Sequence, residues 1–466
     1  MDAYLGGLWL IRLLLQRGLA ALYLLAFIGA LNQFPALLGE RGLLPTPAFL
    51  ARVRFRDAPS LFHWRYSDRL LRAAVWLGII LSAATLLGAT ERMPLALSIA
   101  VWLLLWMLYL SIVNVGQTFY AFGWESMLCE AGFFAAFLGT RELAPSWIVI
   151  AIFRWMLFRV EFGAGLIKIR HDQCWRDLTC LYYHHETQPL PNPLSRVFHR
   201  LPRPVHRFSV AYSHFVQLVA PWGLFAPQPF ASIAAALLIS QQLLLIISGN
   251  YAWLNWLTVV LGVAGFHDAL FGFAVPAVLP RPLVYEWLLY ALAALTLVLS
   301  IRPAINLFSR NQLMNYSWNR YHLVNAYGAF GSITKERYEV VLEGSDDGAA
   351  WKEYAFKAKP GDPMRRPPQV APYHLRLDWL MWFLPFSAGR GYEMWFIRFV
   401  QKLLTNDAPT LALLRGNPFP DRPPRLIRAG YWLYRFSARD EPGWWQRTRV
   451  GEYLPPVTLG DIRSAS

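Results

Sequence analysis

Long apolar runs alternate with short polar segments through the first 300 residues of the chain. A helix needs about 20 predominantly apolar residues to cross the hydrocarbon core of a membrane. About nine runs approach that length, and the true number could lie between roughly seven and ten because several contain Pro, Gly or polar residues. The pattern predicts a multi-pass α-helical membrane protein with spans near 20–38, 73–87, 95–115, 119–138, 147–168, 208–225, 233–248, 253–270 and 284–301.

The pattern changes after Ile301, beyond which no apolar run reaches spanning length. We therefore predict a helical transmembrane domain at 1–301 and a soluble C-terminal domain at 302–466. Strands are expected near 338–356, because polar and apolar residues alternate there and the segment Gly344–Gly348 supplies residues typical of a turn.

Two later stretches of the C-terminal domain carry many aromatic residues. Residues 392–404 and 424–436, which follow a proline-rich segment at 360–372, are predicted to be helices with aromatic faces. The phrase EGSDDGAAW at 343–351 resembles a hairpin of discoidin-type β-sandwich domains. The expected fold of the C-terminal domain is therefore β-sandwich-like or α+β.

The composition supports a membrane setting. Charged residues make up 16% of the chain and hydrophobic residues 56%, whereas about a quarter of the residues are charged in an average soluble protein. This deficit excludes a single water-soluble domain and a disordered chain. The net charge of +15 could indicate nucleic-acid binding, but in a membrane protein basic residues more often mark loop orientation and contacts with anionic lipids. The predicted partner is the lipid bilayer and not a nucleic acid.

Arginines gather on one predicted side of the membrane. If nine helices span it, the loops 39–72 and 169–207 lie on the same side as the C-terminal domain, and they carry 13 arginines against five on the opposite side. The positive-inside rule then places the C-terminal domain in the cytoplasm.

The densest group of polar residues lies at 159–195, from the end of the fifth predicted span into the loop that follows it. A charge at membrane depth is costly and usually faces a cavity or an opposite charge. Glu161 and Lys168 are two helical turns apart and so share one face, with Gly165 between them. Such a glycine permits the close approach of another helix or of a ligand.

Lys168 is the only lysine in the first 334 residues, although the chain carries 44 basic residues. Arginine does not release its proton in proteins, whereas a buried lysine can act as a base. Lys168, with Glu161, is therefore a candidate for catalysis in an intramembrane cavity. The structural alternative is a lysine that extends to the membrane surface or pairs with Glu161.

Cysteine and histidine residues in this segment give weaker signals. Cys174 and Cys180 could form a disulfide if their loop is exoplasmic, and they would stay reduced in a cytoplasm. His171, His184 and His185 could ligate a metal together with nearby carboxylates, but their spacing matches no established pattern, so we predict no metal site. No nucleophile elbow, Walker loop or dinucleotide fingerprint stands out, and the residues identify no cofactor.

Four segments resemble the lipase maturation factor family, over about residues 153–460. They are FGAGLIKIRHDQCWRDLTCLYYHHETQPLPNPLS at 162–195, LNWLTVV at 254–260, NRYHLVNAYGAFGSITKERYEVVLEGSDDG at 319–348 and RLDWLMWF at 376–383. The resemblance adds the motif residues of the first segment to the candidate site: Gly163, Gly165, Arg170, Asp172, Trp175, Arg176, Asp177, His184, His185 and Glu186.

Members of this family are multi-pass membrane proteins, and the vertebrate members lie in the endoplasmic reticulum, where they help secreted dimeric lipases to reach an active folded state. The resemblance therefore implies a chaperone-like maturation factor whose partners are folding clients such as secreted lipases. It also implies a lumenal or exoplasmic C-terminal domain, against the arginine count. The expected location is the endoplasmic reticulum membrane in a eukaryote and the plasma (inner) membrane in a bacterium, and the preference for arginine over lysine favours a bacterial source.

More distantly, the membrane domain resembles the vitamin K-dependent gamma-carboxylase superfamily. That superfamily has a glycine followed three residues later by a lysine, and Gly165 and Lys168 match its conserved glycine and its catalytic base. The sequence departs from the motif at Ile167 and Arg170, so the resemblance implies a shared fold more than a shared reaction. A membrane enzyme that uses Lys168 as a base is the alternative to a maturation factor without enzymatic activity.

Overall fold

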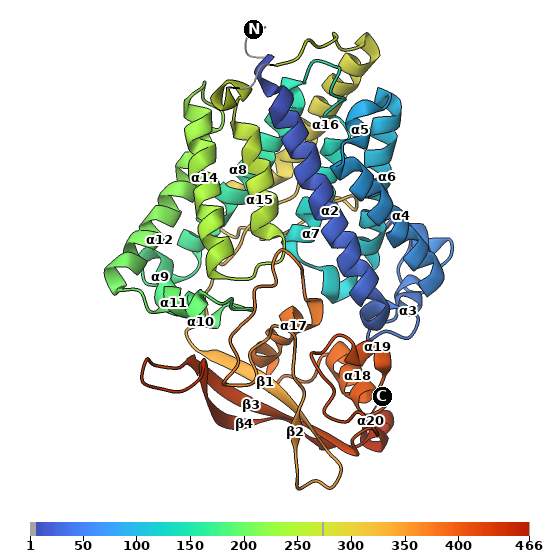
Figure 1. Ribbon diagram of the computed structural model, residues 1–466, viewed down its shortest axis with the longest axis vertical. Helices are drawn as coiled ribbons and strands as arrows, with labels where there is room; N and C mark the ends of the chain where they lie inside the picture. The colour runs from blue at the N-terminus through green and yellow to red at the C-terminus, as the bar shows by residue number, and fades with distance from the viewer. Residues whose placement is uncertain (1–5, 273–274, 466) are drawn as a thin grey trace.

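The computed structural model describes residues 6–272 and 275–465. A tier of long helices and a smaller tier built around a β-sheet follow one another along the longest axis of the molecule (Figure 1). The helical tier ends with α16 (Leu283–Phe308), and the sheet begins with β1 (Arg337–Ser345). The two tiers correspond to the membrane part and the C-terminal part of the sequence pattern.

Five helices of the described chain are long and apolar enough to cross a membrane: α2 (Trp9–Leu38), α4 (Asp68–Leu86), α6 (Leu95–Val115), α14 (Phe230–Ser248) and α16. Helices α4 and α16 bury little of their surface against the rest of the protein. On α16 the side chains of Val284, Leu297 and Val298 are exposed. A continuous apolar surface of this kind is favourable in lipid and unfavourable in water. The multi-pass α-helical membrane fold is thus confirmed.

The other four predicted spans fall in helices that are shorter or more polar: α7 (Gly123–Ala135), α8 (Trp147–Arg170), α12 (Arg203–Leu218) and α15 (Leu254–Gly262). Helix α8 is 24 residues long but carries four buried charged residues, Arg154, Arg159, Glu161 and Lys168. It packs against α7, α12, α15 and α16, so most of its surface faces protein. The total of nine spans and the domain boundary at 301, which falls within α16, stay predictions.

Short helices connect and flank the long ones. In the membrane part they are α3 (Thr46–Leu50), α5 (Ala89–Arg92), α9 (Gln173–Arg176), α10 (Leu181–Thr187), α11 (Ser195–His199) and α13 (Ala220–Gly223). In the C-terminal part they are α17 (Arg376–Met381), α18 (Met394–Leu403), α19 (Ala408–Leu411) and α20 (Leu459–Ala465). Helix α18 confirms the helix predicted at 392–404, and its apolar face, which includes Trp395, Phe396 and Phe399, is buried.

The C-terminal domain contains a four-stranded antiparallel sheet with the strand order β2-β1-β3-β4. Strands β1 and β2 (Lys352–Glu353) confirm the strands predicted near 338–356. Strand β3 (Leu426–Phe436) pairs with β1 on one edge and with β4 (Trp445–Val457) on the other. One sheet accompanied by helices is the α+β alternative of the predicted fold.

The helix predicted at 424–436 is wrong, because this segment forms β3. Tyr431 lies opposite Val340 of β1 and opposite Gly451 of β4, so the strand occupies an interior position of the sheet. Hydrogen bonds to both neighbours satisfy its backbone, and aromatic residues such as Trp432 suit the pleated surface of a sheet. Pairing with strands distant in the sequence therefore outweighs the local pattern.

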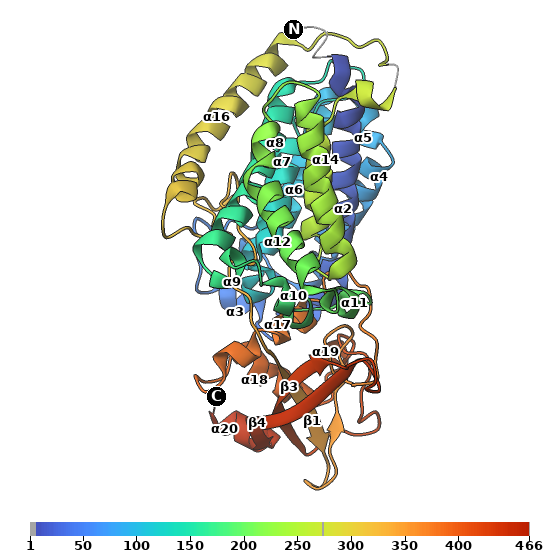
Figure 2. The same cartoon turned by 90° about the vertical axis from the view of Figure 1, so that its left-hand side faces the viewer.

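The loop 169–207 holds the sheet domain against the helical tier, where α10 and α11 lie close to the sheet (Figure 2). Arg337 of β1 donates hydrogen bonds to the carbonyl oxygens of Glu186 and Pro189, both at 3.0 Å. From the loop, Arg196 donates to the carbonyl oxygen of Gly443 at 2.8 Å. These contacts confirm that the C-terminal domain packs onto the membrane domain through this loop.

Candidate functional site

Helix α8 places Glu161 and Lys168 on one buried face. Lys168 lies in the last turn of the helix, which ends at Arg170. Asp172 then begins the short helix α9, because its carboxylate accepts a hydrogen bond from the backbone N–H of Cys174 at 3.0 Å. The local sequence thus ends the helix just after the lysine and turns the chain toward the C-terminal domain.

Two glutamines of neighbouring helices connect the charges on this face. The Lys168 ammonium donates to Gln217 Oε1 at 2.6 Å, and the Gln217 amide donates to Glu161 Oε2 at 3.0 Å. Gln242 of α14 donates to Glu161 Oε1 at 2.7 Å. Both oxygens of Glu161 therefore have amide partners, and Lys168 reaches the carboxylate through Gln217 instead of by direct contact.

The two glycines of the motif permit close packing around these charges. A Cβ atom at Gly165 would lie 2.8 Å from Leu218 Cδ2, so the glycine allows α12, with Gln217, to approach α8. A Cβ atom at Gly163 would lie 2.4 Å from the carbonyl oxygen of Tyr327. Gly163 thus allows the backbone of the segment between α16 and β1 to pack directly against α8.

The end of α8 is held in place by contacts with that same segment. Arg170 donates to Gln312 Oε1 at 2.7 Å, and the indole of Trp175 donates to the carbonyl oxygen of Phe330 at 2.8 Å. The ammonium of Lys168 lies 4.9 Å from the centre of the Trp175 ring, within the range of a cation–π interaction. Arg170 and Trp175 therefore position the lysine and the chain opposite it.

The remaining motif residues have separate roles. His184 pairs through Nε2 with the Tyr251 hydroxyl at 2.8 Å, and burial, reinforced by the charge of Lys168, lowers the pKa of His184 to about 3. His185 packs against the rings of Phe198 and His184. Glu186 accepts a hydrogen bond from the backbone N–H of Phe436 at 2.6 Å, and burial raises the pKa of its carboxyl group.

Arg176 and Asp177 are exposed and line no described cavity. In the part of the chain that the structure describes, one group of His, Cys, Asp and Glu atoms lies close enough together to hold a metal ion, and it consists of Asp172, Cys174 and Cys180. The two cysteines form a disulfide, with Cα atoms 4.8 Å apart. Their sulfurs are therefore not available as the thiolate ligands that a metal requires.

A cavity of about 670 Å³ lies between the membrane helices and the C-terminal domain. Glu161, Lys168, Gln217, Gln242 and Asn255 provide polar groups in its wall. All four segments that carry the family resemblance reach it: Lys168 and His184 from the first, Asn255 and Thr258 from the second, Tyr327 to Thr334 from the third, and Trp379, Trp382 and Phe383 from the fourth. Segments far apart in the sequence thus build one site.

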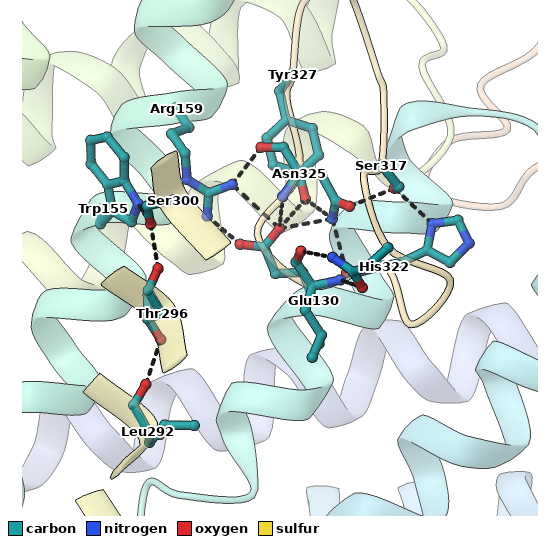
Figure 3. Close-up of polar contacts among 12 residues, drawn as sticks. Glu130, Trp155, Arg159, Leu292, Thr296, Ser300, Ser317, His322, Asn325 and Tyr327 are labelled. Carbon is teal, nitrogen blue, oxygen red and sulfur yellow. Dashed lines mark hydrogen bonds and ion pairs between the residues drawn. The ribbon is translucent and has the colours of Figure 1, made fainter. Parts of the chain in front are cut away.

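A buried ion pair fixes the third of these segments (Figure 3). Arg159 of α8 pairs with Glu130 of α7, and Arg159 Nη1 also donates to the carbonyl oxygen of Asn325 at 2.5 Å. Glu130 Oε2 accepts from the backbone N–H of Asn325 at 2.9 Å and from the Tyr327 hydroxyl at 2.8 Å. All four residues are buried, so the pair anchors the wall of the cavity in the membrane domain.

A second buried ion pair fixes the fourth segment. Arg376 of α17 pairs with Glu125 of α7 at 2.7 Å, and its guanidinium lies over the Tyr120 ring. Sequence reasoning missed Glu125 and Glu130, although an acidic residue inside an apolar run such as 119–138 is itself a signal of a buried partner. The partner could not be named, because it lies about 30 to 250 residues away in the sequence.

These observations define a class: a multi-pass membrane protein whose helical bundle and C-terminal α+β domain together line a cavity with a largely apolar wall and a few charged and amide groups. Two family descriptions match the chain, the lipase maturation factor transmembrane domain over residues 10–273 and the lipase maturation factor C-terminal domain over residues 323–455. The chain belongs to the lipase maturation factor family, as its resemblance predicted.

Curated relatives match over nearly the whole chain. Lipase maturation factor 1 of Bos taurus is 42% identical, over 98% of this chain and 91% of the relative, and the Homo sapiens protein of that name is 41% identical, over 98% and 89%. Lipase maturation factor 2 of Homo sapiens is 31% identical over 98% and 84%. No solved structure matches the chain.

Proposed function

We propose that this protein is a membrane-embedded, chaperone-like maturation factor that assists the folding and assembly of secreted lipases or other client proteins. The observation that best supports this function is the meeting of all four family-like segments at one cavity between the two domains. Relatives with near full-length similarity are named for the maturation of lipases. A domain held against the membrane helices by the buried Arg376–Glu125 ion pair suits a factor that presents a fixed surface to a client.

The proposed location is the endoplasmic reticulum membrane if the source is eukaryotic and the plasma (inner) membrane if it is bacterial. The C-terminal domain is proposed to lie on the lumenal or exoplasmic side, where secreted clients fold. The Cys174–Cys180 disulfide supports this side, because disulfides persist in oxidising compartments. The loop arginines support the opposite side, so orientation is a direct test of the proposal.

The function is tested by complementation. Cells that lack their own lipase maturation factors would produce this chain together with a secreted dimeric lipase, and the specific activity of the lipase in the medium would be measured. We expect the wild-type chain to restore activity. Trp382→Ala, which opens the wall of the cavity, should restore less, whereas Trp64→Ala, at an exposed position outside the cavity, should match the wild type. Inactive secreted lipase at normal levels of the wild-type chain would contradict the proposal.

The alternative of a membrane enzyme that uses Lys168 as a base stays a prediction. One observation favours it, since Lys168 lines a cavity and is not in direct contact with Glu161.

A further inference from the structure

The cavity beside Lys168 has the size of a small-molecule site. Its volume of about 670 Å³ lies within the range of roughly 300–1,000 Å³ that such sites occupy. Phe383 and Phe386 contribute to its wall, yet 41% and 44% of their surfaces remain exposed, so the cavity is open at this end. A folded client protein is far too large to enter, which leaves a small molecule or a single extended chain as the occupant.

Lys168 keeps hydrogen-bonding capacity toward the cavity. An ammonium group has three donors. Within the described ranges one of them has an acceptor, Gln217 Oε1. Glu161 faces the same cavity, but amide groups already occupy both of its oxygens. The lysine is therefore the charged group that is left to bind an anionic atom of a ligand.

Asn255 of α15 provides an independent observation. Its side chain is 2% exposed and lines the cavity, and neither its amide oxygen nor its amide nitrogen has a hydrogen-bond partner among the described residues. A buried amide without a partner is unfavourable, and such groups are rare in folded proteins. A ligand that carries oxygen atoms would give this amide the partner that the protein does not supply.

The rest of the wall is largely aromatic and apolar. Phe122 and Trp124 come from the membrane domain, and Trp379, Trp382 and Phe383 come from the C-terminal domain. Aromatic side chains of this kind bind acyl chains through the burial of apolar surface. The cavity thus combines a cationic, hydrogen-bonding group with a long apolar wall, and the matching ligand is an amphipathic molecule with an anionic head.

We propose that this cavity binds a single-chain lipid whose head group presents an anionic oxygen to Lys168 and Asn255 while its acyl chain lies against the aromatic wall. A carboxylate and a phosphate both provide such an oxygen, so a fatty acid and a lysophospholipid are the two sources of this chemistry. The lipid binds at the base of the bundle, next to the position where the C-terminal domain is attached. Lipid binding here goes beyond the proposed maturation of lipases, although both involve the same cavity, and it is measured on the purified protein without a client.

The test compares three probes of matched chain length on the purified full-length protein in detergent micelles. Palmitic acid, palmitoyl lysophosphatidic acid and hexadecanol would each be titrated, with binding followed by native mass spectrometry. We expect saturable binding of one anionic lipid per chain, and binding of the neutral alcohol that is roughly tenfold to hundredfold weaker, since a charge-assisted hydrogen bond is lost. Preference for palmitic acid or for the lysophospholipid identifies which source the site accepts.

Two variants locate the bound lipid. Lys168→Met and Asn255→Leu should each weaken binding of the preferred anionic lipid at least tenfold, whereas Arg176→Met, which removes an exposed cation of the same loop, should leave it unchanged. Equally tight binding of hexadecanol and of the two anionic lipids by the wild-type protein would overturn the proposal. It would favour an extended client segment as the occupant. Because this comparison uses the wild type, it decides the question even if a variant does not fold.

Discussion

Arg376 and Glu125 form a buried ion pair, with Nη1 and Oε1 2.7 Å apart, that joins the C-terminal domain to a helix of the membrane domain. Both side chains are almost completely inaccessible to solvent. The same guanidinium group donates to the carbonyl oxygen of Phe119 at 2.7 Å and stacks over the Tyr120 ring. Water cannot reach either charge to replace its partner. The relative position of the two domains therefore depends on the contact between Arg376 and Glu125.

Removal of this arginine should destabilise the protein strongly. Arg376→Met leaves Glu125 buried without its cation, and such a loss costs about 3–5 kcal/mol. We expect a markedly lower melting temperature in detergent, measured by tryptophan fluorescence. Arg422→Met removes the cation of an exposed pair with Asp346 and should change the melting temperature little. Equal melting temperatures for the two variants would show that the buried pair does not hold the domains together.

The Lys168→Arg variant distinguishes a membrane enzyme from a maturation factor without enzymatic activity. A lysine acts as a base only after it has released its own proton, whereas arginine stays protonated. If Lys168 acts as a base, Lys168→Arg should abolish activity in the lipase complementation assay while expression and thermal stability stay near wild type. If the lysine supplies only a positive charge, arginine will replace it, and wild-type activity in this variant would leave the client-binding maturation factor as the remaining interpretation.

Cys174 and Cys180 report the side of the membrane on which their loop lies. With an exoplasmic loop, mass spectrometry of peptides from the non-reduced protein should recover the two cysteines bonded to each other, as the structure has them. The single further cysteine of the described chain, Cys129, is buried and serves as an internal reference. Labelling of Cys174 by a membrane-impermeant thiol reagent only after cell lysis would place the C-terminal domain in the cytoplasm.

Buried histidines should make the protein less stable in acid. Burial lowers the pKa of His184 to about 3 and that of His374 to about 4, whereas an unfolded chain keeps the ordinary value near 6.5. The unfolded state therefore binds more protons below pH 6.5, and stability present at pH 7 is lost as the pH falls toward these values. Each group contributes at most about 1.4 kcal/mol per pH unit.

The check is the difference between the melting temperatures at pH 7 and pH 5. His184→Gln keeps a side chain that can bond to Tyr251 but does not titrate, so the difference should become smaller than in the wild type. His171→Gln, at an exposed position, should keep the wild-type difference. An unchanged pH dependence in His184→Gln would mean that other groups cause the acid sensitivity.

Gly163 should not tolerate even a methyl group. A Cβ atom there would lie 2.4 Å from the backbone carbonyl oxygen of Tyr327, and a backbone atom cannot move aside as a flexible side chain can. We expect Gly163→Ala to lower the melting temperature, with a loss of about 1–3 kcal/mol. Gly361→Ala, where a Cβ would meet nothing within 4 Å, is the control. Similar stability of the two variants would argue against close packing of this segment on α8.

Local sequence patterns were sufficient to predict a helix wherever each of its faces meets a uniform environment. The apolar runs at 95–115 and 233–248 predicted α6 and α14 nearly to the residue, because a helix in lipid must satisfy its own backbone and expose apolar side chains. The amphipathic stretch that became α18 was predicted for the same kind of reason, since one face is buried in the domain. The spacing of Glu161 and Lys168 also placed both residues on one face of α8.

Contacts between distant segments required the folded chain. Residues 426–436 carry a pattern that suits a helix or a strand, and pairing with β1 and β4 selects the strand. The link from Lys168 to Glu161 runs through Gln217, 49 residues after the lysine, and Gln242 lies 81 residues after the glutamate. A hydrogen bond between helices forms only when its donor and acceptor lie about 2.7–3.2 Å apart. No periodicity within one helix encodes how its neighbours pack against it.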